Sequence, residues 1–230
     1  MYVEFFGHTG SGKSTLQKRL SDWLEGHGAR VVTFGRGLPL DPIALLRTAR
    51  RVAKLPFFLR MHKDYFAGGV QRKKHIRTHH WRSWLKWFAA NSYMQLYCSR
   101  HADTWFLSGH GFMMALLDTY AWHRLHATPF ELTDRFVDDY LELVEFSPRD
   151  RVVLLDVKPE AAKRRDKARG SRYPGFSEGE MTTLYRSIGY AITLIRARAG
   201  GTVNPIGNET LEDAFRDILA LMNSAAEKSI

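Results

Sequence analysis

Cysteine, long apolar runs and, over one long segment, acidic residues are all scarce in this sequence. A single cysteine, Cys98, excludes a disulfide within the chain and is typical of a reducing compartment. No apolar run approaches the roughly 20 residues that a membrane-spanning helix needs. The N-terminus lacks the basic segment and small-residue cleavage site of a secretory signal. Together these absences predict a cytoplasmic location.

Acidic residues are nearly missing between Arg36 and Arg100. This segment holds 14 Lys or Arg against Asp41 and Asp64, a net charge of +12. Because the whole chain carries +10, the remainder is close to −2. Such a concentration of positive charge predicts that the segment faces an anionic molecule, or that it forms an exposed face that tolerates its own repulsion.

The chain alternates between short β-rich apolar runs and amphipathic segments, which is typical of an α/β domain. Leu16, Leu20 and Leu24 recur at helical spacing between the first two apolar runs, so strand, loop, helix and strand form one βαβ unit with parallel strands. We expect a three-layer α/β/α fold with a parallel sheet of about five strands. The expected strands are 2–6, 29–34, 104–111, 151–157 and 201–207.

Length predicts a single domain over residues 1–230, with a helical, basic insert at 37–100 and a lid region at 160–178. Within the insert, residues 42–100 are expected to be helical but interrupted. Interruptions are expected at Pro56, at Gly68-Gly69 and at the cationic run 71–80, and further helices at 112–125, 129–145, 158–170, 180–198 and 210–222.

Residues 7–14, GHTGSGKS, have the glycine and lysine spacing of a phosphate-binding loop between a strand and a helix. Glycines let successive backbone N–H groups point into one concavity, and the following helix dipole adds to that field. Lys13 can reach the β- and γ-phosphates of ATP, and the Ser14 hydroxyl can bind Mg²⁺. The loop therefore predicts a P-loop NTPase fold in which ATP contacts Gly7, His8, Thr9, Gly10, Ser11, Gly12, Lys13, Ser14 and Thr15.

A second motif follows the strand that ends at Asp156. Arg165 and Arg169 lie four residues apart on a predicted helix, so both guanidinium groups share one face. Arginines placed in this way can neutralise charge on a phosphoryl group during transfer. The alternative is an exposed basic helix balanced by its own acidic residues, and Asp156 is read first as a cap of the turn before Pro159.

With these two motifs the chain resembles the nucleoside-monophosphate-kinase-like P-loop proteins, the thymidylate kinase group in particular. The resemblance implies a kinase that uses ATP and Mg²⁺, with Arg165 and Arg169 as lid arginines that act in catalysis beside Lys13. It also implies that the loop at 205–208 lies against the adenine, which makes Asn208 a nucleotide contact.

Three departures from that group concern the acceptor. Thr9 stands in the loop where the group usually has an acid, and Gly109-His110 stands at the end of the third strand in place of a carboxylate. After the second strand, this chain has the arginine of that group, Arg36, and Asp41 is the acidic residue available there. The departures favour an acceptor other than dTMP.

The segment 71–97 combines cations, histidines and tryptophans, and three interpretations stay open. Trp84, Trp87 and their helical neighbours can pack in the core. Alternatively, cations such as Arg77 and Arg82 can bind an acidic acceptor. The third interpretation is a nucleic-acid or membrane-surface patch.

Two functional hypotheses follow. The first is a phosphotransferase that moves the γ-phosphoryl group of Mg-ATP to a small anionic or polar acceptor, bound by Arg36, Asp41, His110, Arg77 and Arg82. If the acceptor is an alcohol, Asp41 is the expected general base. The second is a nucleotide-dependent switch or ATPase whose basic insert grips nucleic acid, membrane or protein. A homodimer is compatible with either hypothesis, and His110 serves equally well as a turn residue or as a substrate contact.

Overall fold

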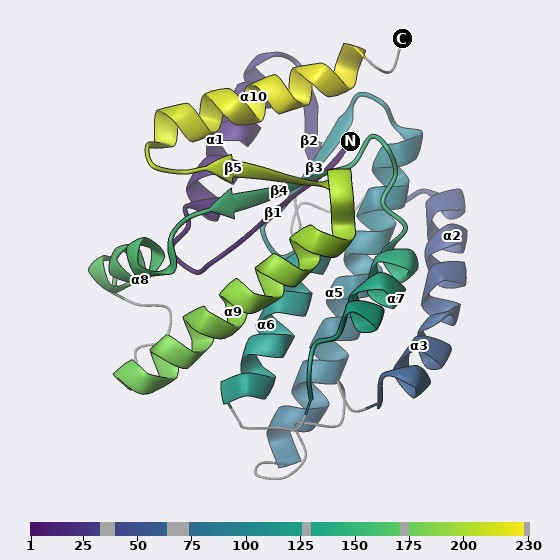
Figure 1. Ribbon diagram of the computed structural model, residues 1–230. Coiled ribbons are helices and arrows are strands. Elements are labelled where there is room, and N and C mark those ends of the chain that lie inside the picture. The colour runs from purple at the N-terminus through teal and green to yellow at the C-terminus, as the bar shows by residue number, and fades with distance from the viewer. Residues whose placement is uncertain (33–39, 64–73, 126–129, 171–174, 228–230) are drawn as a thin grey trace.

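Five short strands form one parallel sheet with the order β2-β3-β1-β4-β5 (Figure 1). The central strands β1 and β4 are almost entirely buried, as their continuous apolar sequences require of strands covered on both faces. The expected parallel five-stranded sheet is confirmed. The strands are β1 Tyr2–Phe6, β2 Arg30–Val32, β3 Thr104–Ser108, β4 Arg151–Asp156 and β5 Val203–Gly207.

This computed structural model describes the backbone of residues 1–32, 40–63, 74–125, 130–170 and 175–227. Side chains are described over the same ranges except at 74–83 and 224–227.

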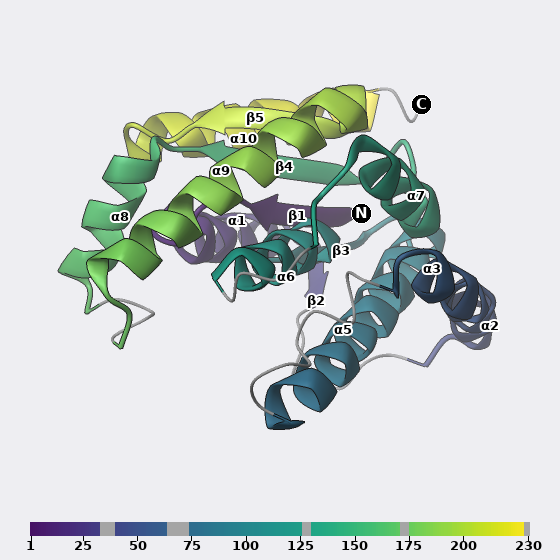
Figure 2. The same cartoon turned by 60° about the horizontal axis from the view of Figure 1, so that its bottom comes forward.

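Helices cover both faces of the sheet and make three layers (Figures 1 and 2). Alternate residues of β1 enter different cores: Tyr2 and Phe6 pack on one face of the sheet, Val3 and Phe5 on the other. The three-layer α/β/α fold is thereby confirmed. On one face lie α1 Lys13–Gly26 and α10 Leu211–Glu227, and on the other lie α5 Lys74–Arg100, α6 Phe112–Leu125, α7 Asp134–Val144 and α9 Glu178–Ala199.

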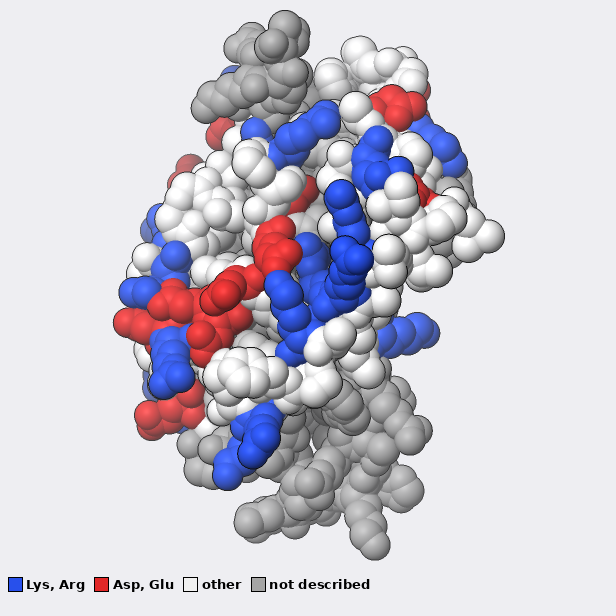
Figure 3. Space-filling view, turned by 90° about the vertical axis from the view of Figure 1, so that its right-hand side faces the viewer, with Lys and Arg blue, Asp and Glu red and all other residues white. Residues whose placement is uncertain are grey.

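Four short elements complete the described fold. Helices α2 and α3 lie on the outside of the molecule beside α5, on the side that Figure 3 views. Helix α8 lies near the end of β1, where the chain turns into α1. Their bounds are α2 Pro42–Ala53, α3 Leu55–Met61, α8 Pro159–Ala168 and the 3₁₀ turn η1 Gly200–Thr202.

The cationic run was expected to interrupt the helices, and this prediction is wrong from Lys74 onward. Helix α5 continues unbroken from Lys74 to Arg100, because no proline or glycine occurs there to stop it. Pro56 lies in the first turn of α3, where its missing N–H costs nothing, and Gly68-Gly69 lie outside the described residues. Over the described chain, no helix has the length and apolarity that crossing a bilayer requires.

Candidate functional site

The loop between β1 and α1 closes tightly against helix α8. Gly10 has a φ of 86°, which disfavours any residue with a side chain. A Cβ atom added at Gly10 would lie 2.2 Å from the carbonyl oxygen of Ala162 in α8. Position 10 of the loop is therefore glycine because α8 occupies the space that a side chain would need.

Lys13 is the buried cation of this loop. Its Nζ donates to the carbonyl oxygens of Gly7 at 3.0 Å and His8 at 2.8 Å, so the ammonium lies within the turn. Helix α1 starts without an acidic residue in its first turn, and its cap, Gly12, offers no side chain to its first N–H groups. Those N–H groups, the helix dipole and Lys13 together make a site for an anion.

His8 fixes the loop to helix α9 instead of facing a phosphate. Its ring stacks on Tyr185 with centroids 5.4 Å apart, and the Tyr185 hydroxyl donates to the Thr9 carbonyl oxygen at 2.9 Å. Burial, with a further contribution from Lys13, lowers the pKa of His8 to about 4. The imidazole is thus neutral at physiological pH, and its side chain is a packing element.

The two predicted lid arginines have different partners. Arg165 donates to the Asn208 carbonyl oxygen at 3.0 Å, whereas Arg169 pairs with the buried Asp166 at 3.1 Å and reaches the pocket. Asn208 in turn donates from its amide to the Ser11 carbonyl oxygen at 2.6 Å. Arg165 and Asn208 therefore support the loop through its backbone at Ser11 and do not line the cavity. Of the two arginines, Arg169 is the one that lines the cavity.

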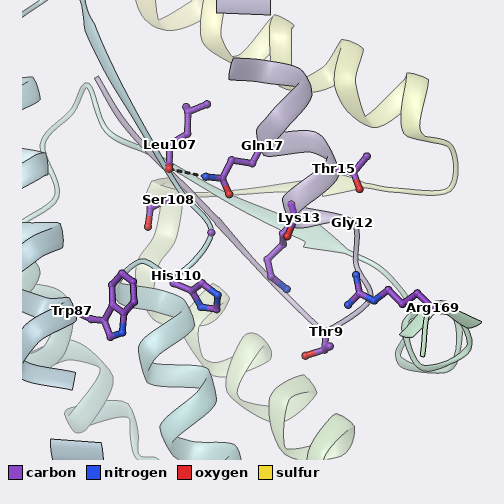
Figure 4. A pocket seen from close by; sticks show the side chains of 13 residues that line it. Thr9, Gly12, Lys13, Thr15, Gln17, Trp87, Leu107, Ser108, His110 and Arg169 are labelled. Carbon is purple, nitrogen blue, oxygen red and sulfur yellow. Dashed lines mark hydrogen bonds between the residues drawn. The ribbon is translucent and has the colours of Figure 1, made fainter. Parts of the chain in front are cut away.

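A cavity of about 300 Å³ opens in front of the loop (Figure 4). Lys13 and Arg169 point toward it from one side, and Trp87 and His110 flank it from the other. Gln17 ties the two sides together, since its amide donates to the Leu107 carbonyl oxygen at 2.8 Å. The lining residues are Thr9, Gly10, Gly12, Lys13, Ser14, Thr15, Gln17, Trp87, Leu107, Ser108, Gly109, His110 and Arg169.

The described lining of this cavity is positively charged and contains no carboxylate. Its ionisable groups are the ammonium of Lys13, the guanidinium of Arg169 and the imidazole of His110. Such a lining attracts anions, and the described part of it offers no carboxylate as a general base or as a metal ligand.

The wall opposite Lys13 is held by Asn91, a residue that no sequence pattern had indicated. The Asn91 amide donates to the carbonyl oxygens of Trp87 at 2.8 Å and His110 at 3.2 Å. Trp87 and His110 consequently approach to 6.1 Å between ring centroids. Trp84 is buried in the core as the packing interpretation predicts, but Trp87 is 38% exposed and lines the cavity instead.

Asp41 does not belong to this cavity. Its carboxylate caps α2 by accepting from the N–H groups of Ile43 and Ala44 at 2.9 Å, and it also accepts from Arg100 at 3.0 Å. The Ala44 hydrogen bond, followed by the pairing with Arg100 and His101, holds the pKa of Asp41 well below its usual range. These contacts give Asp41 a structural role in place of the predicted role as general base or acceptor contact.

The remaining predicted residues are placed as follows. Asp156 is exposed at the end of β4 and pairs with Arg196 at 3.1 Å, away from the described cavity lining. Arg36 lies outside the described residues, and so do the side chains of Arg77 and Arg82.

No protein-family model and no curated protein matches the chain. Solved structures with a similar fold include three of deoxyadenosine kinase from M. mycoides. With the products dCMP and dCDP bound, the TM-score is 0.53 at 18% identity, covering 97% of this chain and 100% of that one. The dATP complex gives 0.55 at 16% identity, covering 97% and 99%, and the dCTP complex gives 0.50 at 18% identity, covering 97% and 100%. The predicted P-loop NTPase fold is thereby confirmed; at these identities the likeness shows a shared fold and no more.

Proposed function

We propose that this protein is an ATP-dependent phosphotransferase that acts on a small acceptor. The observation that carries the proposal is a single cavity with two unlike walls. One wall is the phosphate loop with Lys13, and the other is the Trp87–His110 pair, with Arg169 at the edge between them. A site built in this way holds a donor phosphate and an acceptor face to face, which is the main requirement of phosphoryl transfer.

The donor side fits the phosphates of ATP. The N-terminus of α1, the buried ammonium of Lys13 and the close approach of α8 at Gly10 together form a cradle for an anion. Mg²⁺ would be held by the Ser14 hydroxyl and by phosphate oxygens, since the described residues include no cluster of three or more His, Cys, Asp or Glu side chains able to hold a metal. Bound Mg²⁺ would supply charge neutralisation on the phosphates.

The acceptor that suits the opposite wall is a phosphate monoester attached to a flat ring, other than dTMP. The attacking oxygen of a phosphate is already ionised, so transfer from ATP forms the new P–O bond and releases ADP without moving a proton. This chemistry matches a described lining that has cations and no carboxylate. Trp87 offers a partly exposed aromatic face on which a ring can stack.

A second candidate acceptor is a nucleoside, because the similar structures are named as deoxyadenosine kinases. A nucleoside hydroxyl must lose its proton on attack, and in the described lining the imidazole of His110 is the group able to accept it.

Paired acceptors separate these two candidates. Each nucleoside and its 5′-monophosphate are incubated with Mg-ATP, and phosphorus NMR identifies the product. The main proposal predicts a diphosphate product from a monophosphate acceptor, and His110→Gln is expected to raise the acceptor KM more than it lowers kcat. Phosphorylation of the nucleoside, with kcat lost in His110→Gln, supports the second candidate and overturns the first. ATP turnover that responds to a macromolecule and to no small acceptor would contradict both and favour a switch.

A further inference from the structure

Large apolar side chains that are exposed to solvent gather on one pair of helices. Eight such side chains occur over the described residues, and six of them lie in α2, α3 and the residue before Asp41. Phe57 is 68% exposed and Leu40 is 93% exposed, so most of each side chain is in contact with solvent. The six are Leu40, Ile43, Leu45, Leu46, Phe57 and Met61, and we call their surface the α2–α3 face.

Apart from its apolar side chains, the same face exposes only positively charged ones. Between residues 40 and 63, every exposed side chain is either apolar or cationic, and Asp41, the one acid in that range, is buried in ion pairs. Exposed cations include Arg47, Arg50 and Arg60. Figure 3 shows this side of the molecule, with blue side chains among white ones near its middle and most of the red ones to the left of them.

Three acidic residues in or just after the neighbouring helix α7 have partners of their own. Asp138 pairs with Arg198, and Asp139 pairs with His62 at 2.9 Å. Glu145, just after α7, pairs with Lys54. The charges of Asp138 and Glu145 are thus compensated by the cations beside them, and the arginines of the α2–α3 face can attract an outside anion.

We propose that the α2–α3 face binds the surface of an anionic lipid bilayer, with the two helices lying along the membrane plane. Apolar side chains would enter the boundary between headgroups and acyl chains, and the arginines would contact lipid phosphates. The face exposes no hydroxyl, amide or carboxylate side chain, so its cations are the polar side chains that it presents to a ligand.

A second copy of the chain suits this face less well. A twofold interface brings the same patch of each subunit together, so the arginines of one copy would meet those of the other. Nucleic acid is also anionic, but its phosphate backbone is bound mainly by polar and cationic groups. It would leave the four exposed aliphatic side chains between Leu40 and Leu46 without an apolar partner. The pairing of apolar and cationic side chains therefore favours lipid.

This inference is independent of the proposed reaction, because none of these residues lines the cavity at Lys13. The test is co-flotation of the full chain with vesicles of phosphatidylcholine alone and of an equal mixture of phosphatidylcholine and phosphatidylglycerol. We expect binding to the anionic vesicles only, weakened by salt. Replacing both Arg47 and Arg50 with Gln should weaken it about 30-fold, and Phe57→Ser about 10-fold.

Two substitutions elsewhere provide matched controls. Tyr190→Ser removes an exposed aromatic side chain from α9, and Lys18→Gln removes an exposed cation from α1. Both should leave vesicle binding unchanged, and thermal unfolding confirms that every variant is folded. The proposal is overturned if the anionic vesicles do not bind at low salt, or if the control variants lose as much binding as Phe57→Ser. It is also overturned if Phe57→Ser disrupts a dimer measured by light scattering while leaving vesicle binding intact.

Discussion

The carboxylate of Glu4 accepts a hydrogen bond from the backbone N–H of Met113 at 2.6 Å, which joins the central strand β1 to the first turn of α6. Its other oxygen accepts from the N–H of Phe112 at 2.8 Å. The contact is so close that a Cβ added at Gly111 would lie 2.2 Å from the Glu4 carboxyl carbon. Glu4 thus fixes the turn that carries His110 into the cavity, although it lines no part of the cavity itself.

Glu4 should make stability depend on pH. Burial raises its pKa to about 7 in the folded protein, against an ordinary value of 4.5 for an exposed glutamate. The folded state therefore binds the proton more tightly, and this contribution to stability is lost as pH rises from about 4.5 to about 7. The loss amounts to about 3 kcal/mol at most. Urea unfolding between pH 4.5 and 7 should show that the free energy of unfolding falls less steeply with pH in Glu4→Gln than in the parent protein. The same slope in both proteins would contradict the raised pKa of Glu4.

His8 should have the opposite effect. Its pKa is lowered to about 4 by burial, against an ordinary value of 6.5, so the stability that it contributes is lost as pH falls from about 6.5 to about 4. His8→Phe keeps a ring to stack on Tyr185 and removes the titration. The variant should resist acid unfolding better than the parent protein in urea melts at several pH values. Equal acid sensitivity in the two proteins would show that His8 does not titrate in this way.

Lys13 is expected to be required for transfer. Lys13→Met removes the buried ammonium of the loop that is proposed to bind the donor phosphates, and it should lower kcat by about 10²- to 10³-fold. Lys18→Met is the matched control, since Lys18 lies on the same helix but is exposed and paired with Asp22. Steady-state kinetics of both variants provides the measurement, and similar losses in the two would remove Lys13 from its proposed role.

Arg165 in α8 and Arg169 just after it should differ in their kinetic effects. Arg169→Gln removes a cation that lines the cavity, and we expect it to lower kcat by about 10²-fold with little change in ATP affinity. Arg165→Gln removes the brace on Asn208 and should weaken ATP binding and lower the melting temperature instead. Calorimetric titration with ATP, combined with kcat, distinguishes them. Identical profiles would mean that the two arginines act as one unit.

Local sequence was enough to predict the strands and helices next to the loop that holds Lys13. The apolar strand before Gly7 and the leucine spacing after Lys13 define β1, the loop and α1 without any long-range information. The same holds for β4 and α8, where a buried strand is followed by a proline-initiated helix. In these segments the pattern of neighbouring residues determines the structure.

The remaining contacts around the cavity could not be predicted, because they join residues far apart in the chain. Asn91 in α5 donates a hydrogen bond to the carbonyl oxygen of His110, in the turn after β3. Arg165 in α8 donates to the carbonyl oxygen of Asn208, in the loop after β5. Asp41 was predicted to contact the acceptor because it is an acidic residue. In the structure its carboxylate accepts hydrogen bonds from Arg100 and from the N-terminus of α2 instead. The spacing of residues along the sequence cannot show which polar groups will form hydrogen bonds or ion pairs with each other in the folded chain.

The most direct test of the central claim is the acceptor dependence of ATP turnover, measured as ADP release with the parent protein and with Lys13→Met. The account predicts slow ADP release from Mg-ATP alone and a large acceleration by a small phosphate monoester, with the acceleration absent in Lys13→Met. Fast turnover without an acceptor, or turnover that no small acceptor raises, would contradict it.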